Sequence, residues 1–249
     1  MSLLRVENLS RRFGGVHAVD GVGFTVEAGR LTALIGPNGA GKTTCFNLLN
    51  GQLRPDGGRI CLGERDVTRL GPRRKWALGI ARTFQITSTF GSMTVRENVQ
   101  VALMAHHRRL SALLPAARRL YRVEADALLE RVGMADQAER TTGLLAYGDV
   151  KRLELAIALA NQPRLLLMDE PTAGMAPRER IDLMALTSEI VRERGLGVLF
   201  TEHDMDVVFR HADRVLVMNR GRLIADGTPA EVRADATVRD VYLGAGAPD

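Results

Sequence analysis

"GPNGAGKT", residues 36–43, is the stretch of this 249-residue sequence that most constrains its fold. It matches the pattern GxxxxGK(S/T), follows an apolar run at residues 30–36 and runs into helical spacing at residues 42–50. In such a loop, glycines let backbone N–H groups curve around phosphate oxygens, and the helix N-terminus adds positive charge. The sequence therefore predicts a phosphate-binding loop between a strand and a helix.

Two further apolar runs, residues 164–170 and 197–203, also end in polar residues. Helical spacing follows each of them, over residues 177–194 and 205–211. Short apolar runs that alternate with helices are typical of buried parallel strands whose chemistry lies at their carboxyl ends. We therefore expect an α/β fold, with a P-loop core built on a parallel sheet.

The segments around this core have different patterns. Polar and apolar residues alternate between glycine turns in residues 3–15, 21–29 and 58–67, which predicts an antiparallel β subdomain. Residues 214–227 read as a hairpin that turns at residues 219–221.

Helical spacing without internal proline dominates from about residue 93 to residue 160, which predicts an inserted helical subdomain. We therefore expect a single domain over residues 1–249, with its core at about residues 1–92 and 161–249.

Composition narrows the class of protein. Hydrophobic residues make up 45% of the chain, enough for a sizeable core, and no apolar run approaches the roughly 20 residues that span a bilayer. The first residues lack the pattern of a secretory signal, so we expect a cytoplasmic protein or one peripheral to a membrane. Cys45 and Cys61 are isolated in apolar surroundings and are expected to be buried free thiols.

The charge of the chain has three interpretations. A formal net charge of +5 is compatible with nucleic acid, with anionic lipid headgroups, or with an arginine-rich solvated surface. The arginines are dispersed along the sequence and form no long basic tail, which favours the solvated surface.

Four residues fit a nucleotide site by their chemistry. Lys42 is placed to reach the β- and γ-phosphates, and the Thr43 hydroxyl to complete the coordination of Mg²⁺. Asp169 and Glu170 end an apolar run, where one carboxylate can hold Mg²⁺ through water and the next can face the attacking water. An acidic pair at a strand end can also be a simple turn, and the upstream loop favours the functional interpretation.

The order of the motifs carries a family resemblance. After the phosphate loop come "RTFQ" at residues 82–85, "LAYGD" at 145–149, "MDEP" at 168–171 and "TEHD" at 201–204. This order resembles the ATP-binding subunit of an ABC transporter, and the resemblance covers about residues 4–244.

The resemblance implies a set of site residues. Gln85 matches the glutamine that contacts Mg²⁺ and lines the interface with the membrane subunits, and His203 matches the histidine that contacts the γ-phosphate. Phe13 lies where such proteins stack an aromatic ring on adenine, although Phe is also an ordinary core residue. ATP is expected to contact Phe13, Gly36, Pro37, Asn38, Gly39, Ala40, Gly41, Lys42, Thr43, Thr44 and Gln85, and Mg²⁺ to contact Thr43, Gln85 and Asp169. Glu170, His203 and Lys42 are the expected catalytic residues.

Residues 145–149 fall where the family carries its signature segment, which the resemblance implies closes over the ATP held by a second subunit. The segment comprises Leu145, Ala146, Tyr147, Gly148 and Asp149, and only Leu145 and Gly148 agree with the usual LSGGQ. Ala146 has no hydroxyl to offer, and Asp149 brings negative charge, although an acid in the first turn suits the helix dipole. Ala176 replaces a residue that couples the two sites of the dimer. These departures suggest a slow or asymmetric ATPase.

A narrower resemblance concerns the cargo. "LAYG", "GIARTFQ", "MTVRENV", "TEHDM" and "VYLG" resemble subunits that energise the uptake of branched-chain amino acids. This implies a homodimer or a heterodimer with a related ATPase subunit, integral membrane permease subunits, an extracytoplasmic substrate-binding protein, and a place at the cytoplasmic face of the membrane.

Three alternatives stay open at this point. Subunits that drive lipid or lipopolysaccharide export share the length and a "VYLG"-like ending. A non-transport ATPase of the same fold gains slight support from the basic charge, although binding to nucleic acid is not expected. A scaffold protein with a degenerate site is disfavoured by the intact Lys42, Asp169 and Glu170.

Overall fold

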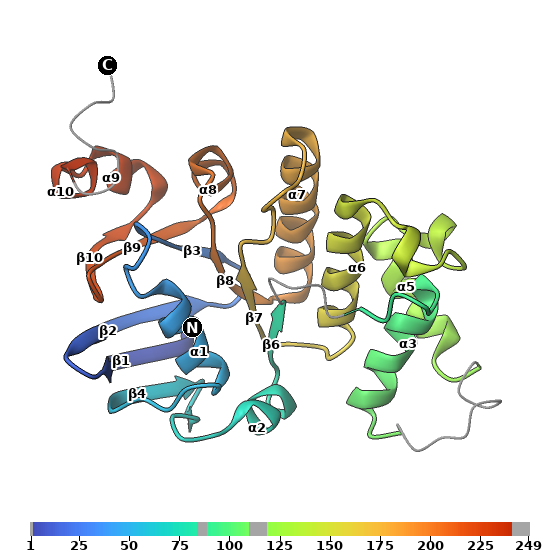
Figure 1. Cartoon of the computed structure of the whole chain (residues 1–249), viewed down its shortest axis with the longest axis horizontal. Helices are drawn as coiled ribbons and strands as arrows, with labels where there is room; N and C mark the ends of the chain where they lie inside the picture. Colours follow the sequence, from blue (N-terminus) through green and yellow to red (C-terminus); the bar gives the residue numbers. More distant parts are fainter. Residues whose placement is uncertain (1, 84–88, 110–118, 241–249) are drawn as a thin grey trace.

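The central sheet of the molecule is mainly parallel (Figure 1). The structure is a computed structural model that describes residues 2–83, 89–109 and 119–240. Within these residues the sheet has the order β10-β9-β3-β8-β7-β6, and every neighbouring pair is parallel except β9 and β10. The strands are β3 (Leu31–Ile35), β6 (Ile80–Thr83), β7 (Leu165–Asp169), β8 (Gly197–Thr201), β9 (Arg214–Asn219) and β10 (Arg222–Gly227).

A second, antiparallel sheet has the order β2-β1-β4-β5. It comprises β1 (Ser2–Phe13), β2 (Val16–Glu27), β4 (Gly57–Leu62) and β5 (Arg65–Asp66). Helix α1 (Lys42–Asn50) buries Phe46 and Leu49 in a core shared with Leu4 of β1 and Leu165 of β7. The helix that follows the phosphate loop is therefore anchored to both sheets.

The opposite face of the parallel sheet is covered by helices (Figure 1). The strands alternate strictly: in β7, Leu166 and Met168 belong to the helix-side core, whereas Leu165 and Leu167 belong to the core shared with α1. The helices are α2 (Pro72–Ala77), α3 (Val95–His106), α5 (Arg122–Arg131), α6 (Tyr147–Leu159), α7 (Pro177–Arg194), α8 (Met205–His211), α9 (Pro229–Ala234) and α10 (Ala236–Val238), with 3₁₀ turns η1 (Ala135–Gln137) and η2 (Thr142–Leu144).

The expected α/β fold is confirmed. The predicted helices at residues 42–50, 177–194 and 205–211 are α1, α7 and α8, and the predicted hairpin is β9–β10. Both cysteines are buried free thiols, as expected. Strand β6 and helix α2 were not predicted, because the short β6 mixes apolar with polar residues and α2 spans less than two turns.

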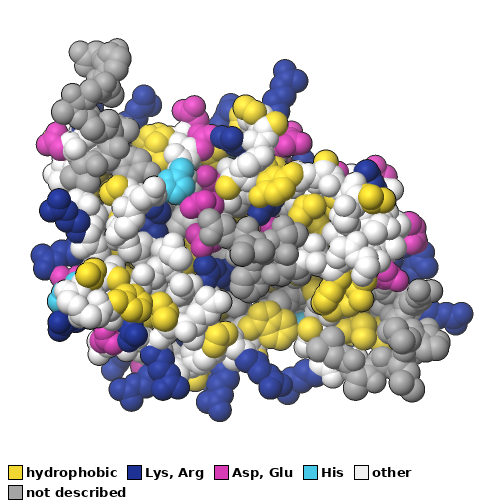
Figure 2. Space-filling model, viewed as in Figure 1, with side chains coloured by type: hydrophobic (Ala, Val, Ile, Leu, Met, Phe, Trp, Pro, Cys, Tyr) yellow, Lys and Arg dark blue, Asp and Glu magenta, His cyan; other side chains and the backbone are white. Residues whose placement is uncertain are grey.

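The surface explains where part of the positive charge lies. Figure 2 shows Lys and Arg side chains around much of the outline, with several along the lower edge near β4 and α2. The exposed arginines of residues 54–74, the segment that carries β4 and begins α2, are Arg54, Arg59, Arg65, Arg69, Arg73 and Arg74. Within the described ranges, no helix combines the length and apolar character needed to cross a lipid bilayer.

Candidate nucleotide-binding site

The loop between β3 and α1 packs so closely that two of its positions admit only glycine. A Cβ atom on Gly36 would lie 2.2 Å from the carbonyl oxygen of Met218, and one on Gly41 would lie 2.1 Å from that of Ala18. Gly41 also has a φ of 103°, which side-chain-bearing residues rarely adopt. The loop is therefore held against β2 and β9 by direct backbone contact.

Positive charge gathers where the loop runs into α1. The helix has no acidic residue in its first turn and no side-chain cap, so its positive end is not neutralised locally. The Lys42 ammonium donates to the carbonyls of Gly36 at 2.6 Å and Pro37 at 3.2 Å. Burial lowers the pKa of Lys42, while the nearby carboxylates of Glu170 and Asp169 oppose that shift. The arrangement suits a phosphate group.

Two acidic residues follow one another at the carboxyl end of β7. The two carboxylate oxygens of Asp169 accept hydrogen bonds from Arg82 Nη2 and from Thr201 Oγ1, each at 2.7 Å. Glu170 has a left-handed backbone with a φ of 49°, uncommon for a residue with a side chain. Its N–H donates to both oxygens of Thr201 at 3.1 Å. Thr201 on the neighbouring strand therefore holds the turn that directs Glu170 towards the loop.

His203 lies beside this acidic pair. Its Nε2 lies 3.0 Å from Glu170 Oε1, and the two side chains are 48% and 24% exposed. The intervening Glu202 is buried and accepts from the N–H and hydroxyl of Thr172, at 2.9 Å and 2.6 Å, and from the N–H of His203 at 3.1 Å. Glu202 thus ties the turn after β7 to the turn after β8, a role that its place inside "TEHD" did not reveal.

These elements enclose a cleft of about 420 Å³. Loop residues 38–44, Glu170 and His203, which the sequence predicted for one site, all reach it. No local motif marks the other lining residues, which come from the start of β2 and from the turn between β9 and β10. The cleft is lined by Val16, His17, Ala18, Asn38, Gly39, Ala40, Gly41, Lys42, Thr43, Thr44, Glu170, His203 and Arg220.

Gly36, Pro37 and Asp169, which were also expected at the site, are not among the residues that line the cleft, and two further expected ligands stand apart from it. Phe13 does not line the cleft; it is 45% exposed at the end of β1, with the Arg11 guanidinium 5.0 Å from its ring centre, whereas Val16 does line the cleft. The adenine contact of Phe13 stays a prediction. Gln85 lies outside the described residues.

The predicted signature segment, residues 145–149, does not line the cleft of its own chain. It begins helix α6, where Ala146 is the N-cap residue without a side-chain cap. The Tyr147 ring is 48% exposed, and a Cβ on Gly148 would lie 3.0 Å from the Glu179 carboxylate. The segment therefore presents a helix N-terminus on the surface, with no side-chain hydroxyl at the N-cap position.

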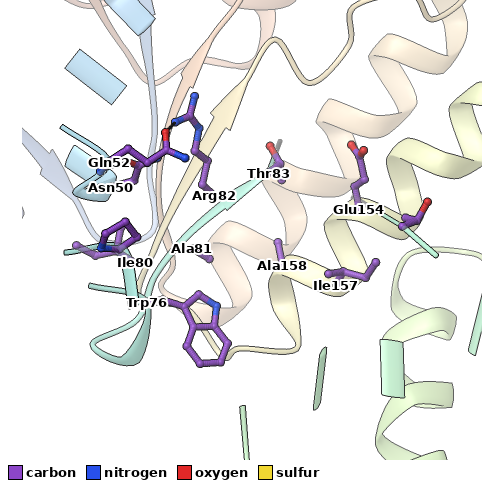
Figure 3. A pocket seen from close by; sticks show the side chains of 12 residues that line it. Asn50, Gln52, Trp76, Ile80, Ala81, Arg82, Thr83, Glu154, Ile157 and Ala158 are labelled. Atoms are coloured by element: carbon purple, nitrogen blue, oxygen red, sulfur yellow. Dashed lines mark hydrogen bonds between the residues drawn. The ribbon is translucent and has the colours of Figure 1, made fainter. Parts of the chain in front are cut away.

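A second hollow, of about 210 Å³, lies between α2, β6 and α6 (Figure 3). We call it the groove. Apolar side chains such as Trp76 and Ile157 share its lining with the polar Gln52, Arg82 and Glu154. Its lining residues are Asn50, Gln52, Pro72, Trp76, Ile80, Ala81, Arg82, Thr83, Thr89, Glu154, Ile157 and Ala158.

Comparison with known proteins gives the family of this chain. The family model described as ABC transporter matches residues 19–173, and the model described as branched-chain amino acid ATP-binding cassette transporter matches residues 222–248. The chain is 41% identical to the high-affinity branched-chain amino acid transport ATP-binding protein BraF of Pseudomonas aeruginosa, across 97% of this chain and 98% of the relative. The LivG protein of Salmonella typhimurium, described in the same words, is 42% identical over the same shares.

A more distant relative and a solved structure extend the comparison. The lipopolysaccharide export system ATP-binding protein LptB of Haemophilus influenzae is 35% identical, across 98% of each chain. The crystal structure of the ADP conformation of an ATP-binding cassette from an ABC transporter superposes with a TM-score of 0.85, at 32% identity, across 98% of this chain and 99% of the other. With these matches along nearly its whole length, the chain belongs to the ABC transporter family, as an ATP-binding subunit that hydrolyses ATP to power transport.

Proposed function

We propose that this subunit powers the import of branched-chain or similar hydrophobic amino acids. The names of the relatives at 41% and 42% identity and the family model matched by residues 222–248 support this cargo. Lipopolysaccharide or lipid export is the second candidate, supported by the relative at 35% identity. Affinity purification of this chain from its native membranes, followed by mass spectrometry, would identify the permease subunits that accompany it. Their identity distinguishes amino acid import from lipopolysaccharide or lipid export.

The nucleotide would be held by the phosphate loop. Lys42 already donates to two loop carbonyls, and phosphate oxygens are stronger acceptors that can replace them. The Thr43 hydroxyl and the Asp169 carboxylate are the hard oxygen donors that Mg²⁺ prefers, and Asp169 is close enough to Lys42 to influence its pKa. When bound, Mg²⁺ would neutralise charge on the phosphates.

Glu170 would accept the proton of the attacking water, and His203 would contact the γ-phosphate. The observation that carries this assignment is the 3.0 Å contact between Glu170 Oε1 and His203 Nε2 at the edge of the loop cleft. Lys42 would stabilise negative charge that spreads over the γ-phosphoryl group. A Gln at position 170 would keep the contact with His203 but could not take the proton.

The substitution Glu170→Gln therefore tests the proposed chemistry. We expect ATP binding to be kept and the rate of phosphate release to fall by at least about a hundredfold, the scale of a lost general base. Asp206→Asn, which makes the same chemical change at an exposed position of α8, is the matched control and should hydrolyse ATP normally. Undiminished phosphate release by Glu170→Gln would remove Glu170 from the central role.

A second ATPase subunit would complete the site. Residues 145–149 lie outside the cleft of their own chain and are exposed in part, so a second copy or a related subunit could apply its own segment to the bound ATP. In size-exclusion chromatography, Glu170→Gln should shift from monomer to dimer with ATP, alone or mixed with a related subunit. The double substitution Ala146→Ser with Asp149→Gln should raise the ATPase rate if the departures from LSGGQ slow hydrolysis. Ala176 is proposed to weaken the coupling between the two ATP sites of the dimer.

Membrane attachment is proposed to occur through permease subunits. The groove between α2, β6 and α6 is the proposed docking place, together with Gln85, which follows β6 in the sequence, and helices α3, α5 and α6 would form the helical subdomain that moves with it. The chain would then lie at the cytoplasmic face of the membrane, in a complex served by an extracytoplasmic substrate-binding protein.

A further inference from the structure

Arg82 connects three elements around the nucleotide site. Its Nη2 donates to Asp169 Oδ2 at 2.7 Å, and its Nη1 donates to Asn47 Oδ1 at 2.6 Å and to Gln52 Oε1 at 3.1 Å. Its guanidinium also lies 5.9 Å from the ring centre of Phe46. One cation on β6 is thus bonded to the end of β7, to helix α1 and to the turn after α1.

The ion pair with Asp169 is shielded from water. The side chain of Arg82 is 11% exposed and that of Asp169 is 6% exposed. Charges in such surroundings are weakly screened, so the guanidinium offsets much of the field of the carboxylate. Because Asp169 is a proposed Mg²⁺ contact, Arg82 lowers the attraction that this side of the site has for a divalent cation.

The same guanidinium also faces the groove. Figure 3 shows Gln52 and Arg82 pointing towards each other across the end of the groove, and both residues line it. Gln52 is exposed, so an acidic group seated beside it would reach the Nη1 side of Arg82. Such a group would compete with Asp169 for one guanidinium.

We propose that Arg82 is a positioning residue that couples the metal contact at Asp169 to the groove. An acidic side chain of a partner, seated in the groove beside Gln52, pairs with Arg82 and competes with Asp169 for the guanidinium. It thereby raises the affinity of the nucleotide site for its divalent cation. Reciprocally, metal binding at Asp169 strengthens the affinity of the groove for the acidic partner. The inference rests on the proposed function, because it takes Asp169 as a metal contact.

The first test measures metal binding directly. The wild-type chain and the variants are loaded with a non-hydrolysable ATP analogue at pH 8, and bound Mn²⁺ is quantified by electron paramagnetic resonance. Arg82→Gln should bind Mn²⁺ about tenfold more tightly, because a unit charge close to a divalent cation has roughly this effect even with water-like screening. Arg82→Lys, which keeps the charge, should remain within about twofold of wild type.

Arg214→Gln is the matched control. Arg214 pairs with Asp226 at 2.6 Å and stands at the start of β9, whereas the cleft lies at the carboxyl ends of the parallel strands. This variant removes one arginine and breaks one ion pair, as Arg82→Gln does. It should leave the Mn²⁺ affinity unchanged.

The second test adds an acidic group of this chain in place of the partner's and leaves Arg82 and Asp169 unchanged. It therefore remains informative even if Arg82→Gln fails to fold. Gln52→Glu places a carboxylate beside Arg82 Nη1 and should tighten Mn²⁺ binding about threefold, whereas Gln52→Ala should not. Combined with Arg82→Lys, whose single ammonium cannot bridge both groups, Gln52→Glu should lose most of its effect. Trp76, the single tryptophan of the sequence, lines the groove, and its emission should change on Mg²⁺ addition less in Gln52→Glu than in wild type.

The outcomes separate the two proposals. Binding of the analogue in the presence of EDTA reports the nucleotide site alone, so a wild-type chain that does not bind it would contradict the proposed function. If the analogue binds, but Arg82→Gln and Gln52→Glu hold Mn²⁺ no more tightly than wild type and Arg214→Gln, the coupling through Arg82 is wrong.

Discussion

Replacing Gly41 by alanine measures how tightly the phosphate loop is held against β2. The new Cβ would lie 2.1 Å from the carbonyl oxygen of Ala18, more than 1 Å inside the roughly 3.3 Å of a close C···O contact. Overpacking of this kind costs about 1–3 kcal/mol, and a side chain at a φ of 103° costs about 1–3 kcal/mol more. We expect a loss near 4 kcal/mol, which lowers the melting temperature by about 8–16 °C for a chain of this length.

Gly39→Ala is the control that separates the contact from the backbone strain. Gly39 also has a positive φ, of 80°, but a Cβ there would meet no atom within 4 Å. It should lose only about 1–2 kcal/mol, or about 2–8 °C. Both variants are melted without nucleotide and followed by circular dichroism. Melting temperatures of Gly41→Ala and Gly39→Ala that agree within about 2 °C would refute the close packing of the loop.

Three further predictions concern other sites. Burial lowers the pKa of Lys75 from 10.5 to about 8, so the unfolded chain binds this proton more tightly and the wild-type free energy of unfolding should rise from pH 8 to pH 10.5 by up to about 3 kcal/mol. Urea unfolding at the two pH values should show that Lys75→Met lacks this rise; an equal rise would contradict the assignment. Burial raises the pKa of Cys45 to about 12, so iodoacetamide at pH 8 should alkylate it only in the unfolded chain, and rapid alkylation of the native chain would argue against its burial. Ala146→Ser supplies the side-chain cap that α6 lacks and should stabilise the chain by about 0.5–2 kcal/mol; an unaltered urea midpoint would mean that the hydroxyl does not cap the helix.

The features that the sequence predicted well have local signals. Helix α7 begins with Pro177 at its first position and ends at Gly195, and helix α8 is capped by the Asp204 side chain, which accepts from the N–H of Asp206 at 3.1 Å. Capping residues of these kinds mark helix ends wherever they occur. The loop residues and the acidic pair were found in the same way, because each belongs to a contiguous motif at a strand end.

The contacts that hold the site together could not be predicted in this way. Arg82 and Asp169 are separated by 87 positions, and Glu202 is separated by 30 from the Thr172 that it binds. Strand β6 was missed although "RTFQ" was recognised, because half of its residues are polar, and the ion pair with Asp169 that accommodates a largely shielded arginine there is not visible in the sequence. A pairing between distant strands depends on the sheet order, which the motifs do not encode.

Strand register links the two hydrophobic cores to the chemistry of the cleft. Asp169 lies opposite Thr201 in the parallel pair of β7 and β8, and this register brings the Thr201 hydroxyl to the carboxylate. A slip by one residue would move Leu167 from the core beside α1 to the helix side, would turn every side chain of β7 to the opposite face, and would turn Asp169 away from Arg82 and Thr201. Both cores are apolar, so the hydrogen bonds of Asp169 with Arg82 and Thr201 favour the observed register where the apolar residues alone do not. The geometry of the site is therefore fixed in part by residues that do not line the cleft.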